Sequence, residues 1–169
     1  MVRGESKRNI ILRVMLIFSI VGLSVTSYQT YEHYFLGTSV CDFTATFSCS
    51  VVTESRFGEF PPSSGIATAA WGILWWSVLA ILVYGTLRKK EWLKLQEFYI
   101  FLWLIGGLIF AIYLLSIELY FLPQETGEIV ICPLCTFQHI LIVANLVLSL
   151  SILKKSIKDY LEDIFYIKK

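Results

Sequence analysis

Hydrophobic residues form four long runs along the chain, and shorter polar segments separate them. A helix needs roughly 20 residues to cross the hydrocarbon core of a bilayer, and each run is long and apolar enough to do so. The four predicted spans are residues 10–28, 65–87, 98–122 and 129–153. The pattern therefore predicts an all-α membrane protein, a bundle of four transmembrane helices. The first run is too long for a signal peptide and no small-residue cleavage site ends it, so we expect it to remain as a span.

The polar segments predict how the spans are connected. Residues 29–64 form a long outer loop between the first two spans, ending in a stretch of prolines and serines that stops one helix and can cap the next. A short inner segment makes the second and third spans an antiparallel hairpin. Residues 1–153 are thus one four-helix domain. In residues 154–169, apolar positions recur at helical spacing between charged ones, which predicts a cytoplasmic amphipathic tail on the membrane surface.

Composition and charge give this bundle an orientation. Hydrophobic residues make up 56% of the chain and charged residues only 16%, which excludes an ordinary soluble domain. The formal net charge of +1 hides an asymmetry, because every lysine and arginine except Arg56 belongs to one of three groups. The first group lies before the first span and in its first turn, and the other two follow the second and the fourth spans: Arg3, Lys7, Arg8 and Arg13; Arg88, Lys89, Lys90 and Lys94; Lys154, Lys155, Lys158, Lys168 and Lys169. By the positive-inside rule, both termini and the middle loop are expected in the cytoplasm.

The two remaining loops, residues 29–64 and about 123–130, are then expected on the opposite side of the membrane, where all four cysteines also fall. Disulfides persist in the periplasm, the cell exterior and the lumen of organelles, whereas cytosolic thiols are kept reduced. The sequence therefore predicts a multi-pass membrane protein with extracytoplasmic cysteines. We expect it in the plasma membrane of a prokaryote rather than in the endoplasmic reticulum, and with no nucleic-acid partner.

Cys132 and Cys135 form a CxxC motif at the outer end of the last predicted span. Two thiols at this spacing share one helical face, which is typical of redox-active pairs. The start of a helix favours a thiolate, so the pKa of Cys132 is expected below its usual range, and Pro133 suits an early helical position. A zinc half-site and an inert disulfide are the alternatives. We expect no metal site, because Cys41 and Cys49 are not spaced as a second zinc knuckle.

Two cysteine pairs that face the same compartment have the layout of a thiol-exchange relay. In such exchange a thiolate attacks a disulfide through a mixed intermediate, so one pair must reach soluble proteins while the other stays beside the electron acceptor. Cys41 and Cys49, on the long loop, are the mobile pair in this interpretation. A non-catalytic membrane protein with two structural disulfides is the competing interpretation.

The order of these features resembles the vitamin K epoxide reductase family. A spaced cysteine pair lies in the first outer loop, a CxxC opens the last of four helices, and the likeness covers nearly the whole chain. The segment that follows the loop pair reads Cys49, Ser50, Val51, Val52, Thr53, Glu54, Ser55. The DsbB type of quinone-linked oxidoreductase is similar in design, but it carries its CxxC at the second helix and its spaced pair later. Cysteine order therefore favours the first family, with the DsbB type as the alternative.

The resemblance implies a role for each cysteine and an acceptor in the membrane. Cys41 would meet the partner, Cys49 would attack the CxxC, Cys132 would receive that attack, and Cys135 would face a quinone of the ubiquinone, menaquinone or vitamin K type. Ser55 matches a loop serine near the quinone pocket. Many prokaryotic members carry a fused thioredoxin-like domain that is not expected here. The implied electron donor is therefore a separate thioredoxin-fold protein, and the implied function is disulfide formation.

The residues after the CxxC depart from the animal enzymes. Thr136, Phe137, Gln138 and His139 stand where those enzymes carry a Thr-Tyr-Ala run. This difference favours a quinone over vitamin K epoxide, so an epoxide or quinone reductase of a carboxylation cycle is kept as an alternative. His139 lies one helical turn beyond Cys135 and is a candidate hydrogen-bond donor or proton path for the quinone. An interhelical hydrogen bond is its other interpretation.

Two further sets of residues have ordinary interpretations. Glu118 lies near the outer end of the third predicted span and is expected to reach the membrane interface. Tryptophans are numerous enough to line an apolar slot for a quinone, although such residues are more often interface anchors or bundle packing. They are Trp71, Trp75, Trp76 and Trp103.

Overall fold

A computed structural model of the chain describes residues 2–44, 46–88 and 96–167, and the side chains among them from 7 to 154. In this described part there are no β-strands, only two isolated bridges between single residues. The helices are α1 (Val2–Tyr31), η1 (Glu32–Leu36), α2 (Cys49–Glu54), α3 (Thr68–Leu87), α4 (Gln96–Ser116), η2 (Ile117–Phe121), α5 (Leu122–Thr126) and α6 (Pro133–Ile167).

Four helical stretches have the length and composition of membrane spans. The π-helix η1 continues α1 without a break, and η2 and α5 continue α4 in the same way. The spans are Lys7–Leu36, Thr68–Leu87, Gln96–Thr126 and Pro133–Lys154. The predicted four-helix membrane protein is therefore confirmed.

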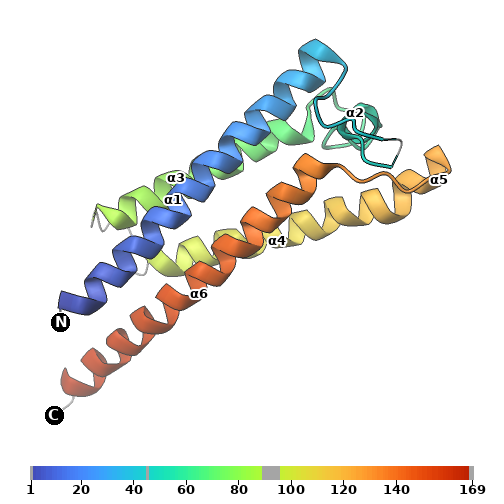
Figure 1. The fold of residues 1–169 in the computed structure, drawn as a ribbon. Coiled ribbons are helices and arrows are strands. Elements are labelled where there is room, and N and C mark those ends of the chain that lie inside the picture. Colours follow the sequence, from blue (N-terminus) through green and yellow to red (C-terminus); the bar gives the residue numbers. More distant parts are fainter. Residues whose placement is uncertain (1, 45, 89–95, 168–169) are drawn as a thin grey trace.

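The bundle has a core of apolar side chains from all four spans. Figure 1 shows α1 beside α3 and α6 beside α4. The buried core residues are Leu12, Met15, Trp76, Leu79, Val83, Ile100, Leu104, Ala111, Leu141, Ile142 and Ile152. Glycine is required at Gly22 because the Trp76 ring occupies the place where a side chain would begin, and this lets α1 and α3 approach closely.

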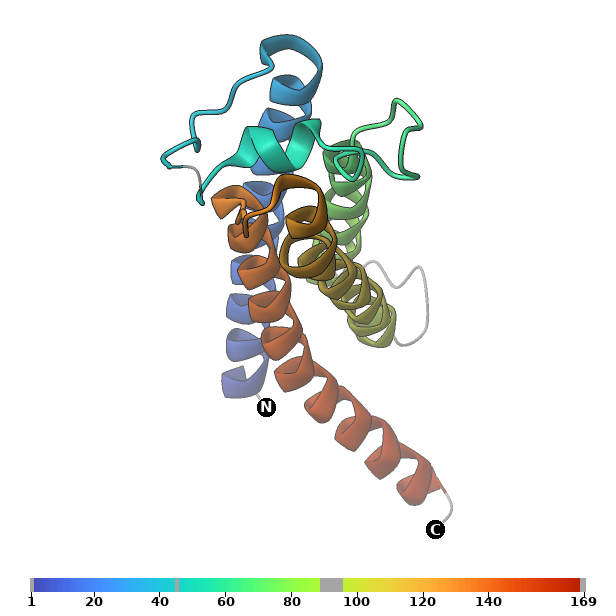
Figure 2. The ribbon, with the colours of Figure 1, turned by 90° about the vertical axis from the view of Figure 1, so that its right-hand side faces the viewer.

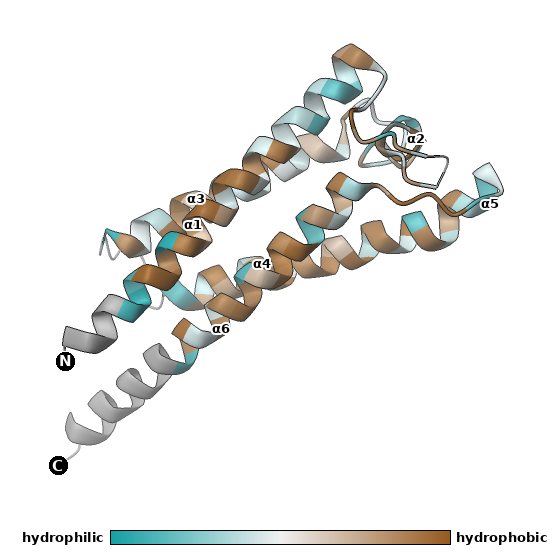
Figure 3. Cartoon of the chain, viewed as in Figure 1, coloured by the Kyte–Doolittle hydropathy of each residue, from teal (hydrophilic) through white to brown (hydrophobic). Residues whose placement is uncertain are grey.

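The outward faces of the long helices are also apolar. Ile17 is 57% exposed, Ile109 64% and Ile140 59%, although each lies in the middle part of a span. Figure 3 shows hydrophobic residues along the described lengths of these helices. A surface of this kind would be unfavourable in water but suits contact with lipid.

The first span is longer than hydropathy predicts. It was expected to end at Tyr28, but the helix continues through η1 to Leu36. Polar residues ended the hydrophobic run, yet two of them are buried inside the bundle: Gln29 is 4% exposed and Glu32 is 3% exposed. The loop predicted for residues 29–64 is consequently shorter, and it contains the helix α2.

The segment between α1 and α3 and the segment between α4 and α6 lie at the same end of the bundle (Figure 1). Figure 2 shows α2 lying across that end, over the start of α6. At the other end, α6 continues as a single helix to Ile167. The predicted amphipathic tail falls on side chains outside the described ones, so its arrangement on a membrane surface stays a prediction.

Candidate functional site: two disulfides above an apolar cavity

Backbone contacts hold the start of α2 against the start of α6. Phe47 and Ile131 form an isolated bridge, in which the Ile131 N–H donates to Thr46 O at 2.8 Å and the Ser48 N–H donates to Ile131 O at 3.2 Å. The Ser48 hydroxyl caps α2 by accepting from the Val51 N–H at 3.3 Å. Each helix thus begins beside a cysteine, and the two starts face each other.

The four cysteines form two disulfides that touch each other. Cys41 is joined to Cys49, and Cys132 is joined to Cys135. Cys132 Sγ lies 3.4 Å from Cys49 Sγ, and both residues are fully buried. Cys41 is buried as well, although the sequence places it on a loop. Because thiol exchange needs sulfur atoms in contact, this arrangement is suited to transfer between the two pairs.

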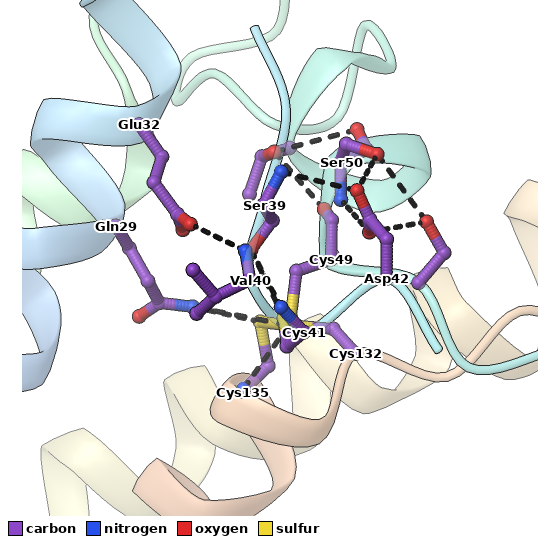
Figure 4. The surroundings of a disulfide bond; sticks show 12 residues. Gln29, Glu32, Ser39, Val40, Cys41, Asp42, Cys49, Ser50, Cys132 and Cys135 are labelled. Atoms are coloured by element: carbon purple, nitrogen blue, oxygen red, sulfur yellow. Dashed lines mark hydrogen bonds between the residues drawn. A yellow bond between two sulfur atoms is a disulfide. The ribbon is translucent and has the colours of Figure 1, made fainter. Parts of the chain in front are cut away.

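Asp42 organises the loop next to Cys41 by accepting several hydrogen bonds (Figure 4). Its carboxylate accepts from the Ser50 hydroxyl at 2.6 Å, the Ser48 hydroxyl at 2.7 Å and the N–H groups of Ser50 and Ser39 at 3.0 Å each. Burial alone would raise the pKa of Asp42, but these hydrogen bonds outweigh it and hold the pKa well below its usual range. Asp42 therefore ties the segment around Cys41 to α2.

Replacing Asp42 by Asn should make the Cys41–Cys49 disulfide easier to reduce. The pKa of Asp42 is lower in the closed loop than in an open one. At pH values above the ordinary carboxyl pKa of about 3.9, the carboxylate therefore stabilises the closed loop, and this stabilisation is lost as the pH falls below that value. With a phosphine reductant at neutral pH, we expect the variant to react about three-fold faster, a small factor because Asp42 is exposed.

The difference between the two proteins should shrink as the pH is lowered below about 4, because Asp42 is then protonated in the open loop and the preference of its carboxylate for the closed loop becomes smaller. Glu54→Gln, at the exposed end of α2, is the matched control and should react like wild type. Equal rates for wild type and Asp42→Asn at neutral pH would show that Asp42 does not hold this loop.

A buried carboxylate at the start of η1, that of Glu32, holds the other side of the loop. Glu32 Oε1 accepts from the Val40 N–H at 3.1 Å, directly before Cys41 (Figure 4). The Ser39 hydroxyl lies 3.2 Å from Cys41 Sγ. The loop disulfide is therefore fixed between the first span and α2.

The CxxC disulfide receives hydrogen bonds from two sides. Its first sulfur, Cys132 Sγ, accepts from the Cys135 N–H at 3.1 Å. Since α6 begins at Pro133, this sulfur caps the helix, and the predicted helix start at the CxxC is confirmed. From α1, the Gln29 amide donates to Cys135 Sγ at 3.4 Å. A donor in this position would stabilise a thiolate on Cys135.

A cavity of about 430 Å³ opens next to Cys135, inside the bundle. Its walls come from all four spans and from the segment between α2 and α3, and they are mostly apolar. All four tryptophans that the sequence singled out line it: Trp71, Trp75, Trp76 and Trp103. Its polar positions include both histidines of the chain, His33 and His139, together with Gln29 and Glu118.

A comparison with protein families matches residues 13–150 to the vitamin K epoxide reductase family. The chain belongs to this family. A search of curated proteins found no match. The matched region contains both cysteine pairs, so the resemblance inferred from cysteine order is confirmed. Membership in the vitamin K epoxide reductase family identifies a membrane oxidoreductase, and this family acts with quinones in general.

The predicted quinone-site residues of this vitamin K epoxide reductase homologue lie in different places. Cys135 and His139 line the cavity, and His139 Nε2 has no hydrogen-bond partner among the described residues. Ser55 ends α2, and its hydroxyl donates to Val52 O at 2.8 Å. It is not part of the cavity lining, whereas Val52 and Thr53 on the same turn are. The assignment of these residues to a quinone stays a prediction.

Glu118 does not reach the membrane interface as expected. It is only 2% exposed, and it lines the cavity beside the CxxC. The expectation failed because α4 does not continue as a regular α-helix: Glu118 lies in η2, whose π-helical geometry changes the direction of the side chains that follow. Its carboxylate lies within 4.8 Å of the sulfur atoms of Cys132 and Cys135. Both sulfurs are in a disulfide here and are not free to bind a metal.

Gln29, Glu32 and His33 were absent from the predicted site, because hydropathy placed them in a loop. A signal was available: three polar residues at helical spacing directly after an apolar run can form one inward face of a continuing helix. Gln29 and His33 both line the cavity, and Glu32 holds the loop.

Proposed function

We propose that this protein carries electrons from protein thiols through two cysteine pairs to a quinone in the membrane, and so promotes disulfide formation. The contact of 3.4 Å between Cys132 Sγ and Cys49 Sγ is the observation that supports it best. Two disulfides with only a structural role need not be in contact, since each stabilises its own segment wherever the other lies. Contact between pairs is what exchange requires.

The relay begins when a separate thioredoxin-fold protein gives two electrons to the Cys41–Cys49 disulfide and leaves with a disulfide of its own. The loop must open for this step, because Cys41 is only 3% exposed. The Cys49 thiolate then attacks Cys132 Sγ, and the bond between Cys132 and Cys135 breaks. Cys135 leaves as a thiolate near the Gln29 amide, which is placed to stabilise it.

The second exchange completes the transfer. The Cys41 thiolate attacks Cys49 in the mixed disulfide and releases Cys132. The loop pair is again a disulfide, and the CxxC now holds two thiols. Two electrons and two protons have therefore moved from the partner to the cysteines beside the cavity, and no other oxidant is needed for this step.

The cavity fits a quinone by size and by chemistry. Its volume of about 430 Å³ lies within the usual range for sites that bind small molecules, and its aromatic walls suit a flat ring. Cys135 and His139 would hold the ring at the polar end, and Ser55 stays a predicted neighbour. A bound quinone supplies an acceptor for two electrons and two protons. His139, whose Nε2 has no hydrogen-bond partner in the described part of the chain, would carry one of these protons.

The proposed orientation follows the positive charges. The start of α1 and the end of α6 would lie in the cytoplasm, and the two disulfides would face the outer side of a prokaryotic plasma membrane. This is the side on which soluble thiol proteins acquire disulfides. The partner would therefore be an extracytoplasmic protein.

The proposed function is tested with purified protein, a reduced thioredoxin-fold protein and a ubiquinone or menaquinone analogue. We expect wild type to reduce the quinone, followed by absorbance, and Cys132→Ser to be inactive because the loop pair then has no sulfur to attack. Vitamin K epoxide replaces the quinone in a parallel assay, and efficient turnover there would favour the epoxide reductase alternative. Quinone reduction that does not depend on Cys132 would disprove the relay.

A further inference from the structure

Glu118 is a buried acid that has no role in the relay described above. It is 2% exposed, it comes from η2 rather than from the CxxC helix, and it lines the same cavity as Cys135 and His139. Its Oε2 atom has no hydrogen-bond partner among the described residues. An ionisable group inside a membrane span is costly to bury and is a functional candidate for that reason.

Three observations connect this acid with the CxxC. The carboxylate and the sulfur atoms of Cys132 and Cys135 lie within 4.8 Å of one another. The π-helical geometry of η2, which is rare and often marks functional sites, directs Glu118 inward. The other titratable groups of the cavity lining are His33 from η1 and Cys135 and His139 from α6, and the lining contains no lysine or arginine among the described residues. Among the described lining residues, Glu118 thus has no lysine or arginine with which it could form a structural ion pair.

We propose that Glu118 carries a proton between the CxxC thiols and the electron acceptor in the cavity. This inference rests on the proposed function and adds a residue to it. Oxidation of the pair to a disulfide gives two electrons to the acceptor, the quinone of the proposed function, and releases two protons. The Glu118 carboxylate takes the proton of the Cys135 thiol while the bond to Cys132 forms, and it then gives this proton to an acceptor oxygen in the cavity. Glu118 ends as it began, and His139 carries the second proton.

A second proton carrier, on a different helix from His139, solves a physical problem. Two protons must reach one acceptor in an apolar space where water is scarce, and each needs a group that can hold it at the correct place. Glu118 lies in η2, which continues α4, whereas His139 lies in α6. The two side chains therefore come from different walls of the cavity.

The experiment compares wild type with Glu118→Gln, which keeps the shape of the side chain but cannot carry the proton. In the quinone-free protein, the infrared difference spectrum between the reduced and oxidised CxxC should contain a band from the Glu118 carboxylate, because the Cys135 thiol that it faces in the reduced pair is replaced by a disulfide sulfur on oxidation. This band should be absent in Glu118→Gln and present in Glu125→Gln. Glu125 is the matched control because it lies on α5, pairs with Arg56 and is not part of the cavity lining.

Turnover provides the second readout. In Glu118→Gln, kcat for quinone reduction should fall about a hundred-fold with little change in KM, the usual effect of losing one acid or base. The pH dependence of kcat should change as well, and Glu118→Asp should restore part of the rate. If Glu118→Gln does not fold, Glu118→Asp still tests the proposal, because the band of the new aspartate should differ in frequency from the band in wild type.

A difference spectrum that is the same in wild type and Glu118→Gln, or an unchanged kcat and pH profile, would overturn the proposal. These results are distinct from failure of the proposed function. If wild type shows no quinone reduction that depends on Cys132, the relay fails, whereas the infrared comparison still shows whether Glu118 responds to the CxxC.

Discussion

Replacing Cys135 by Ala should leave much of the protein with a disulfide between Cys49 and Cys132. Their sulfur atoms lie 3.4 Å apart, so the Cys132 thiolate needs little movement to attack the loop disulfide. In wild type, Cys135 can resolve the mixed disulfide by attacking Cys132, and the variant lacks that thiol. Because the CxxC can no longer form its own disulfide, quinone reduction should fall at least about a hundred-fold. Mass spectrometry of peptides from a nonreducing digest identifies the linkage.

Cys132→Ala is the matched control for the trapped species. It keeps Cys135, whose sulfur lies in the cavity lining, so no linkage to Cys49 is expected. A linkage between Cys41 and Cys132 in the Cys135→Ala protein would contradict the proposed order of the loop pair. It would mean that Cys41, rather than Cys49, attacks the CxxC.

Filling the cavity should weaken quinone use without affecting the cysteines. Leu114, on α4, lines the cavity, and Leu114→Trp would place a larger ring in the space that the quinone is proposed to occupy. We expect KM for the quinone to rise at least about ten-fold, which corresponds to a loss of about 1.4 kcal/mol in binding. Steady-state kinetics with varied quinone concentration measures the effect. Electron exchange between a reduced partner and the cysteines should keep its wild-type rate.

The next residue along the helix is a matched control. Leu115 is 41% exposed, is not part of the cavity lining, and carries the same side chain. Leu115→Trp adds the same ring on the outer face of α4 and should leave KM unchanged. If both variants behave like wild type, the quinone does not bind in this cavity.

The four spans and the two cysteine pairs could be predicted from the sequence because each depends on local information. A membrane span is a long apolar run, and a bilayer sets its minimum length. The CxxC and the proline within it indicate a helix start, and α6 indeed begins at Pro133. The presence of two pairs, one before the second span and one at the last, was sufficient to indicate the family.

The polar residues around the sulfurs could not be placed in the same way. Gln29 and Glu32 end a hydrophobic run, and hydropathy cannot distinguish a helix that stops from one that continues with a buried polar face. Glu118 was expected at the membrane interface because it lies near the outer end of the third predicted span, but it lies in the π-helix η2 and its side chain is buried. Asp42 acts through hydrogen bonds to residues up to eight positions away, which no periodicity reveals. These positions depend on tertiary contacts.

The order in which the two pairs become oxidised tests the relay most directly. All four cysteines are first reduced, a quinone is added without any partner protein, and samples are alkylated at short intervals for mass spectrometry. The account predicts that the Cys132–Cys135 disulfide forms first and that the Cys41–Cys49 disulfide follows, because only the CxxC lies beside the cavity. Oxidation of the loop pair before the CxxC, or no oxidation that depends on the quinone, would contradict it.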